Sequence, residues 1–202
     1  DFPDSKAFQK YGNGMNRDQW RRSNVDSIIL KLANAIKAEK PWVKFGISPF
    51  GVWRNKSQDP MGSETQAGQT NYDDLYADIL LWLRKGWIDY VVPQLYWEIG
   101  HEKADYLTLI HWWSQNSYGK HCYIGLAPYR ANNNAAWRDK TQLPRQIELT
   151  RTVPNIQGQV YFSSKSFINN PNGWNDSLQQ NYYKQQVPTP AMPWLPKKPV
   201  RK

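Results

Sequence analysis

Short apolar runs alternate along the chain with longer segments whose apolar residues recur at helical spacing. Residues 42–50 (WVKFGISPF) and 88–97 (IDYVVPQLYW) are two such runs, and the segment 71–86 between them has helical periodicity, with Asn71 as its expected cap and Gly86 as its expected end. The expected strands are 42–50, 88–97, 120–129 and 158–167, and the expected helices are 18–39, 71–86, 102–117, 143–153 and 173–183. The order is one helix followed by four strand–helix units.

Repeated strand–helix units predict an α/β fold, in which helices cover a parallel sheet. The runs are apolar almost throughout, as expected for strands buried on both faces. A spacing of about 30–40 residues per unit suits a (β/α)8 barrel. It also suits half of a doubly wound sheet, although no G-x-G-x-x-G follows any run. Because four strands cannot close a barrel, the barrel interpretation makes this chain about the C-terminal half of one.

Composition sets further limits on the class of protein. Residues 1–184 form the predicted partial barrel, and the proline-rich residues 185–202 form an extended tail. The single cysteine, Cys122, lies in an apolar run and cannot form an internal disulfide. No stretch approaches the ~20 apolar residues of a transmembrane helix. The three histidines lack metal-site spacing, so we expect no metal and no cofactor.

The net charge of +9 favours anionic partners in general, and it is equally explained by solubility. The densest basic stretch is the end of the chain, PKKPVRK, and no cluster is dense enough for a nucleic-acid surface. We therefore expect no nucleic-acid partner. Aromatic residues make up 14% of the chain, with 11 Trp and 12 Tyr, and such rings suit both cores and binding surfaces.

Each expected strand ends in a change from apolar to polar and aromatic residues. In a barrel these C-terminal strand ends build the active site. The first such end begins at Ser48, and the side chains able to stack on sugar rings are Trp53, Tyr96, Trp97 and Tyr129. Those that suit hydroxyl or acetamido groups are Gln94, Ser163 and Ser164, and those that suit a carboxylate are Arg54, Arg130 and Lys165. Any one of them could serve packing alone; their recurrence at four strand ends favours a pocket.

Glycoside hydrolysis usually requires two carboxylates that flank the scissile bond. Glu98 is the acid directly after a strand motif and is the weak candidate for a catalytic acid, with a solvated rim residue as the alternative. Asp89 lies near a strand start and therefore at the wrong end of the barrel. The chain thus offers no convincing pair, and the catalytic residues are unknown.

Three long stretches resemble the bacterial glycosyl-hydrolase-like family ten, whose members are TIM-barrel proteins and often lipoproteins. They are WVKFGISPFGVWRN, NYDDLYADILLWLRKGWIDYVVPQLYWEIGH and GQVYFSSKSF, and MPWL (192–195) is similar to the C-terminal region of the family. The resemblance implies a (β/α)8 barrel that acts on glycans, in which the four strands of this chain would be the fifth to the eighth. Better understood members are similar to peptidoglycan glycosidases that cleave strands stripped of stem peptides.

The resemblance also implies where the rest of the site lies. The acidic motif of the family precedes the region that matches DFPD, so the catalytic acids are expected upstream of residue 1, and this fragment alone is expected to be inactive. The residues that carry over as substrate-binding are Ser48, Trp53, Arg54, Gln94, Tyr96, Trp97, Tyr129, Ser163 and Lys165. The implied partners are a glycan and the N-terminal half of the barrel, or another chain that completes the sheet. The implied location is the bacterial cell envelope or outside the cell.

Two other functions remain open from sequence. A degenerate barrel could bind carbohydrate without catalysis, since fold does not fix function. A glycosidase for another polysaccharide would also show these strand ends.

Overall fold

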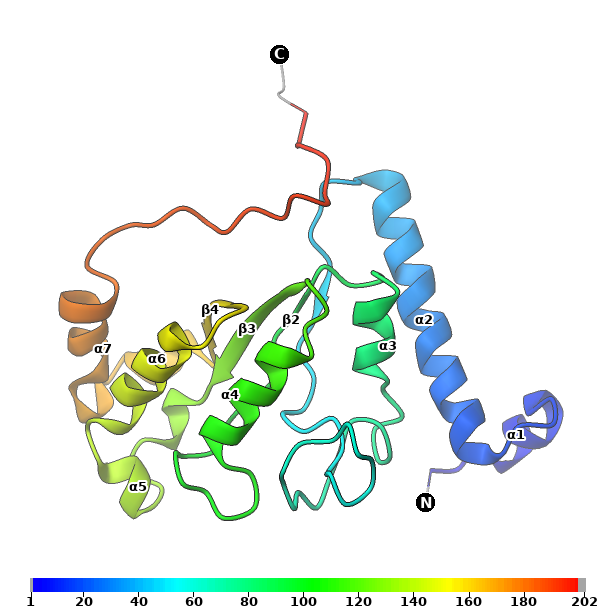
Figure 1. Ribbon diagram of the computed structural model, residues 1–202, viewed down its shortest axis with the longest axis horizontal. Coiled ribbons are helices and arrows are strands. Elements are labelled where there is room, and N and C mark those ends of the chain that lie inside the picture. The colour runs from blue at the N-terminus through cyan, green and yellow to red at the C-terminus, as the bar shows by residue number, and fades with distance from the viewer. Residues whose placement is uncertain (1, 200–202) are drawn as a thin grey trace.

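Four parallel strands form one sheet in the computed structural model, which describes residues 2–199. The strands are β1 (Gly46–Ile47), β2 (Tyr90–Val91), β3 (His121–Leu126) and β4 (Ile156–Tyr161). They lie in chain order, and each pairs in parallel with the next. Helices connect successive strands, and α4 and α6 lie across one face of the sheet (Figure 1). The α/β class is confirmed, and the arrangement is that of half a (β/α)8 barrel.

The helices follow the expected order, with additions. They are α1 (Ser5–Tyr11), α2 (Arg17–Glu39), α3 (Ile79–Arg84), α4 (Tyr106–Gln115), α5 (Ala135–Arg138), α6 (Gln142–Thr152) and α7 (Trp174–Ser177), which continues as a π-helical turn, η4 (Leu178–Tyr182). The short helices α1 and α5 were not predicted. None of the helices in residues 2–199 combines the length and the apolar character that a membrane-spanning segment requires.

The expected helix 71–86 is wrong in its first half. The helix α3 begins at Ile79, where the Asp78 side chain accepts a hydrogen bond from the Leu81 N–H at 3.1 Å. Asn71 does not cap it, because its buried amide donates instead to the Phe50 carbonyl at 2.8 Å. Residues 71–78 therefore belong to the long loop after β1. The helix ends before Gly86, which adopts φ +66° as a terminating glycine should.

The paired strands are shorter than the apolar runs predicted. Prolines lie beyond the ends of β1, β2 and β3, and a proline has no N–H to donate to the ladder. The fourth strand was expected at 158–167, but it begins at Ile156, directly after the left-handed residue Asn155 at φ +61°. The end of that predicted strand instead forms a 3-10 turn, η2 (Ser164–Phe167). Proline and turn chemistry thus set the strand limits more tightly than apolar content does.

The main core lies between the sheet and the helices that follow its strands. Cys122, Ile124 and Leu126 of β3 point into it and are fully buried, as expected for Cys122. Trp82 of α3 and Trp113 of α4 are also buried there, and each indole N–H reaches an acceptor, Asp26 at 2.6 Å and the Gly51 carbonyl at 2.8 Å. Burial of rings of this size contributes several kcal/mol each. This layer fixes the strands that carry the site.

Glycines and tyrosines alternate on the opposite face of the sheet, which would be the interior of a closed barrel. Tyr90 and Tyr123 meet edge to face with ring centroids 5.9 Å apart. A Cβ at Gly46 would lie 2.5 Å from the Tyr90 ring, and one at Gly158 would contact the ring of Tyr123 at 3.5 Å. The small residues therefore make room for the rings of the neighbouring strands.

The chain returns at its end to the side of the sheet where the strands begin. Figure 1 shows residues 184–199 running from α7 along that edge towards the start of β1. The Trp194 indole N–H donates to Asp89 Oδ1 at 3.0 Å, and its ring meets His121 edge to face at 5.2 Å. Residues 200–202, the end of the predicted tail, lie outside the described residues.

Asp89 is the centre of this end of the sheet. Its Oδ2 accepts from Lys37 Nζ at 2.7 Å and from the Phe45 N–H at 2.8 Å, while its Oδ1 accepts from Trp194. The carboxylate therefore ties together α2, the segment before β1 and the tail. This location agrees with the prediction that Asp89 faces away from the site.

Candidate functional site

The C-terminal ends of the four strands meet along one edge of the sheet, which is the lower edge in Figure 1. Pairing continues slightly past the strands, because Gln94 bridges to both Phe50 and Gly125 and the Phe162 N–H donates to the Leu126 carbonyl at 3.0 Å. The segments after the strands are therefore held in register. This edge is where a (β/α) barrel builds its active site.

Ser48 and Gln94 are brought together at the first two strand ends. The Gln94 amide donates to the Ser48 carbonyl at 3.1 Å, and the Ser48 hydroxyl donates to the Val92 carbonyl at 2.9 Å. Both side chains thus donate hydrogen bonds to backbone carbonyls at the strand ends. Together they place a neutral hydroxyl and a neutral amide next to each other at this end of the sheet. Such a pair can orient hydroxyl groups and supplies no charge.

Three aromatic rings form a cluster at the ends of β2, β3 and β4: Tyr96, Tyr129 and Phe162. Tyr96 lies edge to face with Tyr129 at 5.9 Å and stacks on Phe162 at 6.3 Å with 26° between the rings. Tyr129 and Phe162 meet at 6.2 Å and 85°. Tyr129 keeps 46% and Phe162 62% of its surface exposed. The exposed faces of Tyr129 and Phe162 form a ready stacking surface.

Phe162 was missing from the sequence-based candidates. The period of two along a strand was the signal that could have found it, because residues 158, 160 and 162 share the face that carries the site. Burial raises the pKa of Tyr96, with a smaller contribution from the neighbouring Tyr129, so Tyr96 stays a neutral hydroxyl.

An open depression of about 450 Å³ adjoins the cluster, between the ends of β3 and β4. Tyr129 and Phe162 form part of its wall, and Ser163 and Lys165 line it as well. The structure therefore brings four of the expected or newly found residues to one place. Ser164 is exposed in the same turn and is not among the lining residues.

Trp97 lies next to this surface but is partly built into the core. Its ring meets Phe50 edge to face at 5.3 Å, and its carbonyl accepts from the Gln146 amide at 2.8 Å. Gly51 permits this position, since a Cβ there would lie 2.5 Å from the Trp97 ring. Trp97 is half-buried and presents only part of its ring to solvent.

The structure places Trp53 away from the surface of the site. Only 5% of Trp53 is exposed, and its ring stacks on Trp112 with centroids 6.1 Å apart. The Trp53 ring therefore has no exposed face on which a sugar could stack, and the expectation of stacking at this position is corrected. The reason is that the Trp53 side chain packs into the core and does not point into the pocket.

Arg54 is likewise occupied within its own loop. It forms a bidentate pair with Asp73 (Nε to Oδ2 and Nη2 to Oδ1, both 2.9 Å), and its Nη1 donates to Asp59 Oδ2 at 2.9 Å. Its guanidinium also lies 4.6 Å from the centre of the Tyr72 ring. Arg54 therefore fastens the loop 51–78 and does not offer a guanidinium to a substrate carboxylate.

Glu98 holds the helix α5. Its Oε2 accepts from the indole N–H of the buried Trp137 at 3.0 Å, and its Oε1 accepts from the Asn134 amide at 3.3 Å. These two donors hold the Glu98 side chain in place. The contacts support a positional role for Glu98 at the rim.

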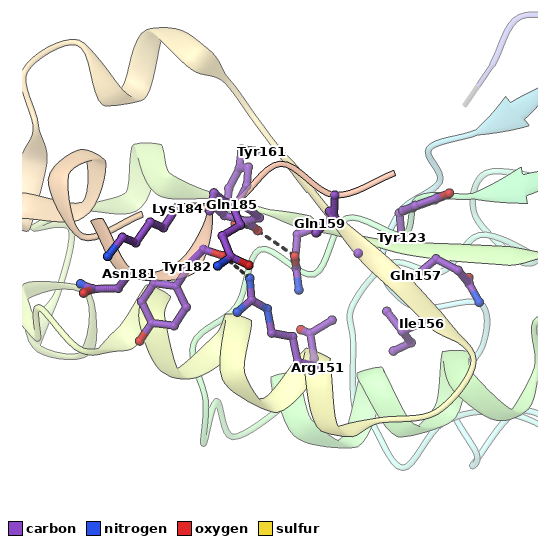
Figure 2. Close-up of a pocket in the computed structure, with 14 residues that line it drawn as sticks. Tyr123, Arg151, Ile156, Gln157, Gln159, Tyr161, Asn181, Tyr182, Lys184 and Gln185 are labelled. Atoms are coloured by element: carbon purple, nitrogen blue, oxygen red, sulfur yellow. Dashed lines mark hydrogen bonds between the residues drawn. The ribbon is translucent and has the colours of Figure 1, made fainter. Parts of the chain in front are cut away.

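A larger cavity of about 800 Å³ lies elsewhere, along the outer edge of β4 (Figure 2). Gln157, Gln159 and Tyr161 of β4 line one side, and residues 181–185 and Val187 line the other. Arg151 closes it through a 2.6 Å hydrogen bond to the Tyr182 carbonyl. This edge of β4 has no partner strand within residues 2–199, so the cavity occupies the position of a neighbouring strand. This cavity is not the candidate site, because it runs along β4 from the first residue, Ile156, instead of lying at the C-terminal ends of the strands.

The candidate site offers aromatic stacking, neutral hydrogen bonding and the positive charge of the exposed Lys165. Within residues 2–199 no group of three His, Cys, Asp or Glu side chains could hold a metal ion. The arrangement suits a neutral or anionic polyhydroxylated ligand such as a glycan.

These features define a half-barrel protein with an aromatic, carbohydrate-compatible edge. The profile of the family described as Glycosyl hydrolase-like 10 matches residues 1–142. The chain belongs to this family, as its resemblance indicated.

Two curated relatives agree with the assignment. The chain is 47% identical over 209 aligned residues to "Glycosyl hydrolase YngK" of Bacillus subtilis (strain 168), covering 98% of this chain and 41% of that protein. It is 36% identical over 178 residues to "Glycosyl hydrolase DigH" of Escherichia coli (strain K12), covering 83% of this chain and 40% of that protein. The chain thus spans about two fifths of the length of these relatives.

Proposed function

We propose that the protein is a glycoside hydrolase acting on a bacterial cell-wall glycan, and that this half barrel forms one wall of the substrate cleft. The observation that carries the proposal is the exposed cluster of Tyr96, Tyr129 and Phe162 at the C-terminal strand ends. The family and the printed names of the two relatives support the hydrolase class.

Peptide-free peptidoglycan strands are the substrate we propose. The lactyl group of N-acetylmuramic acid makes such strands anionic once the peptides are removed, and the chain carries a net charge of +9. Action on this polymer fits a protein secreted to the cell envelope or anchored there as a lipoprotein, which we propose as its location.

We place the catalytic carboxylates outside residues 2–199. Glycosidases require a pair of acids that flank the scissile bond, and Glu98 is engaged by Trp137 and Asn134. The relatives extend well beyond the matched region, which leaves room for the pair. In this scheme the described half binds and orients the glycan, hydrolysis proceeds through an oxocarbenium-like transition state, and residues 1–202 alone are inactive.

The remaining strands of the barrel would occupy the two open edges of the sheet. The cavity along β4 provides the place for a closing strand, and α2 carries an uncovered apolar stripe in which Ile28 is 58% and Leu32 46% exposed. A neighbouring helix would cover this stripe, as helices do around a barrel.

The proposal that a helix covers this apolar stripe can be tested by introducing a charged side chain into it. In the full-length protein, Ile28→Glu should lower the free energy of unfolding by about 2 kcal/mol or more, because a covered carboxylate is desolvated. The matched control is Ile168→Glu, which is exposed outside the stripe and should change stability little. Equal effects of the two substitutions would contradict a covering helix.

The function itself is tested with the full-length protein and three substrates: peptide-free peptidoglycan strands, intact sacculi and a neutral α-glucan, with products identified by mass spectrometry. Saccharides released from the peptide-free strands alone are the expected result. Products from the α-glucan would retain the hydrolase and reject the cell-wall substrate. Binding without product from any substrate would favour a non-catalytic carbohydrate-binding barrel.

A further inference from the structure

The depression between the ends of β3 and β4 contains a single charged side chain. Its lining includes Pro128, Tyr129, Phe162, Ser163, Lys165 and Asn169, and none of its lining residues is acidic. Lys165 is exposed, and no carboxylate of residues 2–199 lies within ion-pair distance of it. The positive charge of this pocket is therefore not neutralised from within the described chain.

The other arginines near the strand ends do not compete for this role. Arg54 is held by Asp73 and Asp59. Arg130 is half-buried, with its guanidinium carbon 5.8 Å from the centre of the Tyr129 ring, and it is not among the residues that line the depression. Lys165 is thus the cation that faces the open volume, and a flexible ammonium suits an anion at a solvated position.

The aromatic wall of the pocket has a corner shape. Tyr129 and Phe162 stand nearly perpendicular to one another, at 85°, and Tyr96 stacks on Phe162. A pyranose can lay its C–H face on one ring while its edge contacts the other. Ser163 and Asn169 then offer hydrogen-bonding groups beside the charge.

We propose that this corner is a subsite for a sugar unit that bears a carboxylate, with Phe162 and Tyr129 as stacking faces and Lys165 as the partner of the carboxylate. The inference rests on the proposed glycan function and adds the residues that would discriminate charged from neutral units. Phe162 contributes affinity for any sugar ring, whereas Lys165 contributes only the preference for the charged one.

The test compares two forms of one ligand in the full-length protein. Peptide-free peptidoglycan strands are used as prepared and after chemical reduction of their carboxylates to alcohols, which removes the charge and keeps the rings. Dissociation constants are measured by calorimetry, and hydrolysis is followed in parallel. The variants are Lys165→Met, Phe162→Ala and the control Lys140→Met, which removes an equally exposed charge away from the pocket.

The wild-type protein should bind native strands about two- to fivefold more tightly than reduced strands, as expected for an exposed ion pair, and added salt should diminish the ratio. In Lys165→Met the ratio should fall to about one, while Lys140→Met should keep it. Phe162→Ala should weaken both ligands on the order of tenfold without changing the ratio, and Phe162→Trp should restore binding.

The outcomes separate this inference from the hydrolase proposal. If product forms and Lys165→Met still binds native strands more tightly than reduced strands, the subsite is overturned and the hydrolase proposal is retained. A wild-type ratio of one also overturns the subsite. Binding whose preference is lost in Lys165→Met, without product, supports the subsite and overturns the hydrolase. Absence of binding to either ligand overturns both.

Discussion

Replacement of Asp89 by alanine should be among the most damaging substitutions in the described chain, although Asp89 lies far from the candidate site. The carboxylate is buried and accepts three hydrogen bonds, from Lys37, the Phe45 N–H and Trp194. In Asp89→Ala the N–H of the half-buried Phe45 loses its acceptor, and Lys37 loses its counter-charge.

The expected magnitude follows from these partners. A hydrogen bond from a backbone N–H to a charged acceptor contributes about 1.5–3 kcal/mol. The Lys37 side chain is 31% exposed, so solvent screens its ion pair with Asp89. This pair should therefore contribute about 1 kcal/mol to stability, as surface ion pairs do. The half-exposed Trp194 adds about 1 kcal/mol. We therefore expect Asp89→Ala to lower the free energy of unfolding by about 3–5 kcal/mol, in the range for removing one partner of a buried pair.

Urea denaturation of the full-length protein measures this loss as a shift in midpoint at unchanged slope. Hydrogen exchange of the Phe45 amide, followed by mass spectrometry, should rise at the same time. Glu102→Ala is the control, because Glu102 is exposed and makes no hydrogen bond among residues 2–199. A loss below about 1 kcal/mol for Asp89→Ala, or an unchanged exchange rate at Phe45, would refute the reasoning.

Three further predictions concern the sheet and its tail. Gly125→Ala should cost about 1–3 kcal/mol, since its Cβ would lie 2.9 Å from a carbonyl of the segment after β2; Gly68→Ala, with no atom within 4 Å, is the control, and equal melting temperatures would contradict the close approach. Trp194→Ala should speed limited proteolysis within residues 184–199, and an unchanged cleavage rate would mean that the indole does not anchor the tail. Burial lowers the pKa of His121, helped by the nearby Lys44 charge, so the stability of the neutral imidazole is present above its ordinary pKa of about 6.5 and is lost as pH falls through the folded value. Tail cleavage should therefore rise between pH 7 and 5, and the rise should vanish in His121→Gln.

The fold could be predicted from the sequence because its signal is repeated. In each strand–helix unit a short apolar run is followed by a segment whose apolar residues recur at helical spacing. The order of the strands in the sheet follows because consecutive parallel strands usually lie next to each other. The error at residues 71–78 has a local cause. Asp73 and Asp74 have the character of first-turn residues, but Asp73 is bound by Arg54 from across the loop. That contact depends on a loop path that no periodicity encodes.

The position of the site stays a prediction, and the structure shows which of its expected members lie together. Tyr96, Tyr129, Ser163 and Lys165 do meet at the strand ends. Trp53 could not be assigned to the core by composition, because a tryptophan is equally at home in a core and on a binding surface. Arg54 could not be recognised as occupied, since its partners come from 5 and 19 residues further along the chain.

The contact between Trp194 and Asp89 has a consequence for the order in which the protein is made. These two residues are 105 positions apart in the sequence, and Trp194 follows all four strands. During synthesis the strands and their helices emerge first and can pair while the ribosome is still translating. The hydrogen bond from Trp194 to Asp89, at the start of the strands, cannot form until Trp194 has left the exit tunnel. Until then the nascent sheet keeps the Asp89 carboxylate one donor short, so this end of the molecule is completed only after all four strands have been synthesised.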